Sequence, residues 1–207
     1  GDLQGVEHVI CLSTETGEVL WQNDLKYSGP CLLLGDRVIT QGYDSAGFSL
    51  GILDGKRVQV AHPISGRMTD WGYIRNYGCN TAIGSDHLLT FRSGAAGFYD
   101  LLNDSGTGNI GGFKSSCTSN LIPANGVLSA PDYTRTCSCA YQNQTSLALV
   151  HMPEIETWTV HPAASTTSPG EMIERLAINF GAPGDRRDEQ GMLWLEHPVV
   201  AGVSPPL

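Results

Sequence analysis

The sequence lacks several features by which common protein classes are recognised. Of its 207 residues only 16% are charged, and 12 Lys and Arg face 21 Asp and Glu, so the formal net charge is −9. A chain with so few basic residues is poorly suited to phosphate backbones and to anionic membrane surfaces. No apolar run reaches the roughly 18 residues that a membrane-spanning helix needs. We therefore expect neither nucleic-acid binding nor a membrane span.

Local motifs for catalysis and metal binding are missing as well. The six histidines show no H-x-H, H-x3-H or HExxH spacing, and no C-x2-C-H haem motif occurs. There is no G-x-S-x-G nucleophile elbow and no phosphate-binding P-loop. A G-x-G-x-x-G string spans residues 106–111, but no predicted strand precedes it and no helix follows, so we interpret it as a run of β-turns. The sequence predicts no cofactor and no metal.

What the chain has in quantity is glycine, with 25 residues, alongside 11 prolines and 41% hydrophobic residues. Helical bundles need many Glu, Lys and Arg on their outer faces, so this composition favours a β-rich and turn-rich protein. The length suits one domain, or a domain followed by a tail.

Six cysteines raise the question of disulfides: Cys11, Cys31, Cys79, Cys117, Cys137 and Cys139. The nearest pair is a C-x-C, and no second pair exists to complete a zinc ribbon. We expect two disulfides among Cys79, Cys117, Cys137 and Cys139, which would indicate an oxidising compartment. Cys11 and Cys31 are expected to be small buried strand residues. The alternative, six free thiols in a cytosolic protein, stays open.

An internal repeat is the strongest signal. Residues 36–54 match residues 86–104 at an offset of 50. Identical residues occupy four matched places: Asp36 with Asp86, Thr40 with Thr90, Ala46-Gly47-Phe48 with Ala96-Gly97-Phe98, and Asp54 with Asp104. In each copy short apolar runs are bounded by Gly, Asp and Asn, which predicts β-hairpins. The two segments therefore represent two copies of one supersecondary unit.

Further copies extend this repeat in both directions. A third lies at residues 124–150 and a partial one at residues 9–21. Repeats of about 40–50 residues with four strands each are typical of β-propeller blades. The predicted fold class is all-β, a partial β-propeller of three to four antiparallel blades in residues 1–160. Residues 161–207 are predicted to form a linker and a C-terminal strand or strap segment, with strands at 177–180 and 191–195 around a charged turn at 185–189.

One segment carries a family resemblance. Residues 11–21 (CLSTETGEVLW) resemble the Asp-x-x-Thr-Gly-x-x-x-Trp blade signature of quinoprotein-like (PQQ-type) β-propeller repeat proteins. Thr16, Gly17 and Trp21 match, whereas Ser13 stands where Asp is usual. In that family the Gly makes the hairpin turn and the Trp packs between blades.

Two further segments resemble known proteins. Residues 78–153 are similar to the C-terminal blades of quinoprotein-like propellers from Planctomycetes-type bacteria, through residues 91–101, 117–126 and 133–141. Together these resemblances cover residues 5–155 and imply a periplasmic or extracellular propeller without a settled activity. Residues 178–181 with Gly191 and Trp194 resemble the opening of malectin-like carbohydrate-binding domains; the alternative is a last strand and strap that complete the propeller.

The resemblance also implies partners. Propellers of this family close with about seven or eight blades, which is more than this chain supplies. An open ring exposes strand edges and an apolar blade face. We therefore expect the remaining propeller blades, or other polypeptides of an assembly, to be partners.

Candidate ligand-binding residues lie in two polar loop regions beside Gly and Pro. They are Arg92, Tyr99, Asp100, Asp132, Tyr133 and Arg135. The alternative is structural, with Arg92 and Arg135 pairing with Asp100 and Asp132 to fix the loops.

Three functions follow from these observations. The leading hypothesis is an exported propeller segment that acts as a binding or scaffold module, with polysaccharide as a candidate ligand, within a larger protein or assembly. The second is a carbohydrate-active lyase or hydrolase with its site at the blade centre. The third is a PQQ-dependent dehydrogenase, which would need an adjacent Cys-Cys pair that the sequence lacks. No residue is assigned a catalytic role.

Overall fold

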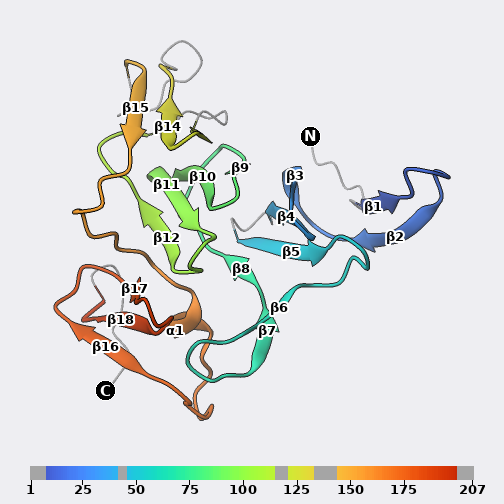
Figure 1. Ribbon diagram of the computed structural model, residues 1–207. Coiled ribbons are helices and arrows are strands. Elements are labelled where there is room, and N and C mark those ends of the chain that lie inside the picture. The colour runs from blue at the N-terminus through green and yellow to red at the C-terminus, as the bar shows by residue number, and fades with distance from the viewer. Residues whose placement is uncertain (1–7, 42–45, 115–120, 133–143, 200–207) are drawn as a thin grey trace.

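The fold consists of small β-sheets that follow one another along the chain (Figure 1). The computed structural model describes residues 8–41, 46–114, 121–132 and 144–199. Every strand pairing in these ranges is antiparallel except one. The all-β prediction of several small antiparallel sheets is confirmed. None of the helices in the described ranges has the length and apolar character of a bilayer span.

The described sheets contain two, three or four strands. The first pairs β1 (His8–Leu12) with β2 (Val19–Asp24). Two four-stranded sheets follow, and a three-stranded sheet comes after them. The first four-stranded sheet contains β3 (Ser28–Leu34), β4 (Arg37–Gln41), β5 (Gly47–Gly51) and β8 (Gly72–Tyr73). The second contains β9 (Ile83–Gly84), β10 (Leu88–Ser93), β11 (Ala95–Asp100) and β12 (Gly106–Asn109). The three-stranded sheet contains β13 (Ile122–Ala124), β14 (Val127–Ala130) and β15 (Leu147–Val150).

The predicted repeat is present in the strand register. In the first four-stranded sheet Ile39 pairs with Ser49, and in the second Leu89 pairs with Tyr99, so both partners shift by 50. Ile39 and Leu89 are fully buried in one core, which also contains Trp71, Tyr73, Phe91 and Tyr99. The matched positions thus hold the two sheets together, as an apolar residue at the centre of a packed strand should.

The two copies differ at their fourth strand. In the second copy β12 runs beside β11 without interruption, so the interpretation of residues 106–111 as β-turns alone was wrong. In the first copy Leu50 pairs with Arg57, the chain then leaves the sheet, and only Gly72 and Tyr73 return to it. The excursion is a hairpin of β6 (Gln59–Ala61) and β7 (Met68–Asp70).

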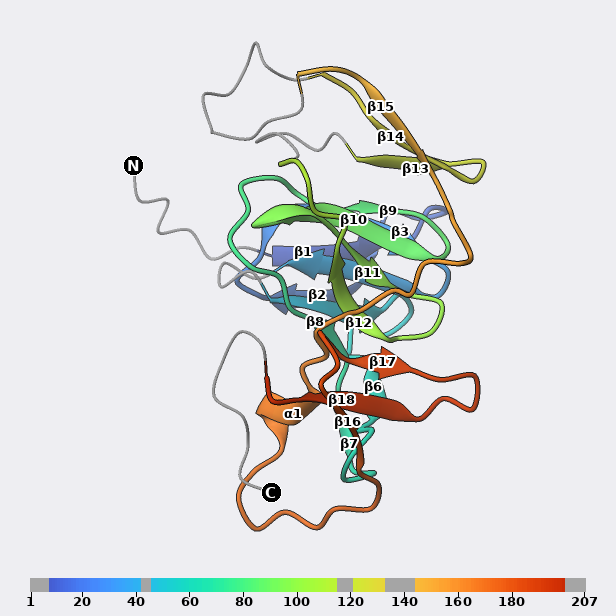
Figure 2. The same cartoon turned by 90° about the vertical axis from the view of Figure 1, so that its left-hand side faces the viewer.

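The C-terminal residues form a unit of their own beside this hairpin (Figure 2). It contains α1 (Ala163–Thr166), β16 (Ala177–Phe180), β17 (Arg186–Arg187) and β18 (Leu193–His197). The strand predicted at 177–180 is confirmed as β16, whereas the one predicted at 191–195 starts two residues later and continues to His197 as β18. The two strands pair in parallel, and the supposed turn at 185–189 contains β17. Ile64 of the hairpin packs with Ala163, Leu193 and Leu195, so the excursion serves as the docking point of this unit.

The N-terminal hairpin packs against the first four-stranded sheet. The indole Nε1 of Trp21 donates to the carbonyl of Ile52 at 2.9 Å, and its ring lies against a core that includes Val9 and Leu50. Trp21 therefore lies between two sheets, as the blade signature implied.

The cysteines give no disulfide among the described residues. Cys11 and Cys31 are half-buried strand residues with free thiols. Cys79 is exposed and free, with its sulfur 3.3 Å from the Tyr77 hydroxyl. Its three candidate partners, Cys117, Cys137 and Cys139, lie outside the described residues.

Candidate functional site

The candidate ligand residues are spread over several places. Tyr133 and Arg135 lie outside the described residues, and Asp132 stands at the edge of the described range. Arg92 is buried in β10, where its backbone N–H donates to Asn80. Among the members of this set that the structure describes, Tyr99 borders the cavity discussed below.

Asp100 has a local structural task. Its carboxylate accepts hydrogen bonds from the backbone N–H groups of Leu102 and Asn103, at 3.0 and 3.1 Å, and from the side chains of Asn103 and Ser105 at 2.9 Å. These bonds fix the turn between β11 and β12, since an Asp side chain readily replaces backbone acceptors in turns.

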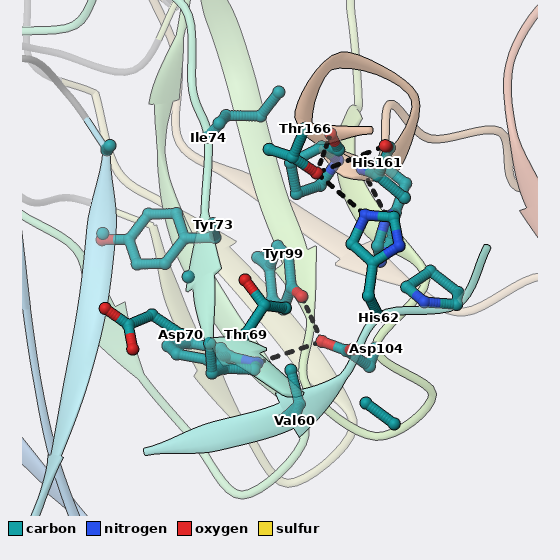
Figure 3. A pocket seen from close by; sticks show the side chains of 18 residues that line it. Val60, His62, Thr69, Asp70, Tyr73, Ile74, Tyr99, Asp104, His161 and Thr166 are labelled. Atoms are coloured by element: carbon teal, nitrogen blue, oxygen red, sulfur yellow. Dashed lines mark hydrogen bonds between the residues drawn. The ribbon is translucent and has the colours of Figure 1, made fainter. Parts of the chain in front are cut away.

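The cavity lies where three parts of the molecule meet (Figure 3). It has a volume of about 170 Å³ and is bounded by the β6–β7 hairpin, by β8, and by residues 161–166 of the C-terminal unit. Its aromatic wall consists of Trp71, Tyr73 and Tyr99, whose ring centroids are 5.7 to 6.1 Å apart. Apolar walls with a few polar groups are typical of small-molecule sites.

Asp104 joins the parts that surround this cavity. It occupies the turn before β12 with a φ of 51°, a backbone conformation that Asp tolerates better than most residues. Its Oδ1 accepts from Trp71 Nε1 at 3.1 Å and from the Tyr99 hydroxyl. Its backbone carbonyl accepts from Nε and Nη2 of Arg187 in β17, at 3.2 and 3.1 Å.

This arrangement keeps Tyr99 protonated. Burial and the adjacent Asp104 carboxylate raise the pKa of the Tyr99 hydroxyl far above its ordinary value. Tyr99 is therefore a permanent donor, and Asp104 already accepts from two side chains. Both groups are better suited to holding the wall of the cavity than to transferring protons to a ligand.

Two His-Pro turns form the polar side of the cavity. In each, the imidazole Nδ1 accepts from the backbone N–H two residues later, from Ile64 to His62 at 3.3 Å and from Ala163 to His161 at 3.1 Å. Because Nδ1 of His161 accepts, we place the proton of its neutral ring on Nε2. The Nε2 of His62 lies 3.0 Å from the Thr166 hydroxyl and so links the hairpin to α1.

His161 is uncharged at neutral pH. The pKa of its imidazole is lowered to about 4, chiefly by burial; the Asp104 charge opposes this shift, and Arg187 and His62 add to it. The backbone N–H of His161 donates to Asp185, whose own pKa burial raises. His161 therefore presents a neutral imidazole to the cavity.

The sequence contained one signal for this site that we did not use. His-Pro occurs at 62–63, 161–162 and 197–198, and the first two pairs lie one in each of the two segments that meet at the cavity. In the described part of the chain, no three His, Cys, Asp or Glu side chains converge as a metal site would require.

Comparisons with known proteins add little. No family model matches the sequence, and no curated protein matches it. Among solved structures, the crystal structure of BamB from Moraxella catarrhalis is similar to the chain, with a TM-score of 0.39 and 18% identity. The match covers 60% of this chain and 37% of that one.

The charge state of His161 makes stability depend on pH. The folded protein holds this imidazole neutral down to about pH 4, whereas the unfolded chain binds a proton near pH 6.5. The unfolded state therefore binds more protons in this window, and the free energy of unfolding falls as the pH drops from 6.5 to 4. Replacing His161 with Gln should reduce that slope, as measured by urea denaturation at several pH values. His151→Gln, at an exposed position, should keep the wild-type slope; equal slopes in all three proteins would contradict the assignment.

Proposed function

We propose that this chain is a binding segment of an exported β-propeller-type protein and that the cavity beside Asp104 holds its ligand. The cavity itself is the observation that carries this proposal, because it combines an aromatic wall with hydrogen-bonding imidazole, hydroxyl and carboxylate side chains. An internal cavity of about 150 Å³ accommodates one benzene-sized molecule. A volume of about 170 Å³ therefore suits a single six-membered ring.

The chemistry of the lining favours an uncharged, hydroxyl-bearing ring. Imidazoles of His62 and His161 and hydroxyls of Thr69 and Thr166 border the space, and these groups pair well with sugar hydroxyls. The net charge of −9 disfavours an anionic ligand. One sugar unit of a polysaccharide fits these demands, in agreement with the polysaccharide expected from the sequence.

A scaffold role rests on the outer face of the N-terminal hairpin. Along β1 and β2 the inward residues Val9 and Trp21 pack on the neighbouring sheet, whereas Ile10 and Leu20 point outward and are 48% and 60% exposed. Each of the next two sheets meets sheets on both of its faces. We propose that a further sheet, from the rest of a larger protein or from an assembly partner, covers this outer face. Export is carried over from the resemblance of residues 5–155 to exported quinoprotein-like propellers. The expectation of two disulfides no longer supports it, because Cys79 is free in the structure and only Cys117, Cys137 and Cys139 then remain.

The cavity proposal is tested by filling the space. Thr69 lies in β7 and borders the cavity, so Thr69→Phe should place a ring inside it and weaken sugar binding at least about tenfold. Thr69→Ser keeps the hydroxyl and should bind as the wild type does. Ligand-observed NMR with a set of neutral monosaccharides measures this. Failure of the wild type to bind any of them, or equal binding by all three proteins, would rule the proposal out.

The scaffold proposal is tested by measuring the molar mass of the folded protein in solution at increasing concentration. We expect the chain to self-associate at high concentration through the exposed Ile10 and Leu20 side chains of β1 and β2, since exposed apolar side chains on a sheet favour association. The double variant Ile10→Glu with Leu20→Glu should return it to a monomer in light scattering after gel filtration. A wild-type chain that stays monomeric at every concentration would contradict this.

A further inference from the structure

A row of large side chains crosses the C-terminal sheet. Arg186 of β17 pairs with Trp194 of β18. On the other side of β17, Thr159 pairs with Asp185 in antiparallel fashion through two backbone hydrogen bonds, of 3.0 and 2.7 Å. This register places Trp158 opposite Arg186. Trp158, one residue before this isolated bridge, therefore lies beside Arg186 of β17, which in turn lies beside Trp194 of β18.

The row lies on the outer face of the sheet. Thr159, Asp185 and Leu193, each one residue away in sequence, are 3% to 5% exposed on the inner face. Trp194 is 40% exposed, and the side chain of Arg186 is 50% exposed. Since successive strand residues point to opposite faces, this alternation separates the outer row from the core that borders the cavity.

Trp194 and Arg186 are held in place by hydrogen bonds. The indole Nε1 of Trp194 donates to Asp188 Oδ2 at 2.9 Å, and that carboxylate also accepts from the backbone of the β17–β18 turn. Arg186 donates to Glu156 at 3.0 Å, and its guanidinium carbon lies 6.0 Å from the centre of the Trp158 ring. An exposed indole fixed in this way loses little conformational entropy when a ligand stacks on it.

We propose that this row, Trp158, Arg186 and Trp194, is a stacking surface for a neutral, extended oligosaccharide. The two indoles are separated by two inter-strand spacings, a distance of about 10 Å. This distance is close to that between every second sugar ring in an extended β-linked chain. The flat C–H face of a pyranose packs on an aromatic ring, and Arg186 between the indoles can donate to hydroxyl oxygens.

The charge of the surface selects against acidic sugars. Arg186 is already neutralised by Glu156, and Asp188 adds a negative charge beside Trp194. An acidic polysaccharide would meet a net negative surface. The inference rests on the proposed function for its ligand class, but it concerns a different surface and a longer stretch of sugar chain than the cavity can hold.

The test is isothermal titration calorimetry with β-1,4-linked oligosaccharides of glucose, xylose and N-acetylglucosamine. Trp194→Ala should weaken the binding of the oligosaccharide at least about tenfold, whereas Trp194→Phe, which retains a stacking ring, should lose much less. Phe180→Ala is the matched control, because Phe180 is a more exposed aromatic residue of the same sheet outside the row. An oligomer of galacturonic acid, the acidic probe, should not bind.

The outcomes separate this surface from the cavity. Weakening by Trp194→Ala, with oligosaccharide binding retained in Thr69→Phe, supports the stacking surface even if no monosaccharide enters the cavity. Binding unchanged in Trp194→Ala, equal weakening by Phe180→Ala, tighter binding of the acidic oligomer, or no binding of any neutral oligomer would each overturn the inference. The cavity proposal would survive these results if Thr69→Phe still abolished monosaccharide binding.

Discussion

The structure depends on the hydrogen bonds of one turn residue, Asp104. Its carboxylate accepts from Trp71, at the root of the hairpin excursion, and from Tyr99, within the second four-stranded sheet. Its backbone carbonyl accepts from Arg187 in the C-terminal unit. A hydrogen bond to a charged acceptor contributes about 1.5–3 kcal/mol when the alternative is a buried unpaired donor. Three segments distant in sequence are therefore held by a single residue.

The cavity follows from this constraint. Trp71 and Tyr99 form its wall because Asp104 orients them, and His161 borders it because β17 is anchored through Arg187. A second connection closes the other side, where His62 meets Thr166 and Ile64 packs on the C-terminal core. Both proposed sugar contacts, inside the cavity and on the outer row of the C-terminal sheet, depend on the C-terminal unit being fixed to the blades.

The parts that the sequence predicted are local or repetitive. The offset of 50 predicted two copies of one unit, and the registers of β4 with β5 and of β10 with β11 agree at that offset, because matched apolar positions occupy matched places in a sheet. The site was not predictable in the same way. Residues 59–70 have an ordinary hairpin pattern, and nothing local indicates that the pair leaves its blade. Asp104 stood out as a repeat position, but its partners Trp71 and Arg187 are 33 and 83 residues away. Asp100, chosen for its loop, instead fixes its own turn.

Amide hydrogen exchange of an Asp104 variant tests this account most directly. Asp104→Ala removes the acceptor of Trp71 and Tyr99 and disfavours the positive φ. Asp104→Asn keeps both an oxygen acceptor and a side chain that tolerates this φ. We predict that Asp104→Ala loses exchange protection in β6, β7 and residues 159–166 while β10 stays protected, and that Asp104→Asn retains most of it. Unchanged protection of these segments in Asp104→Ala, or an equal loss across the whole molecule, would contradict the account.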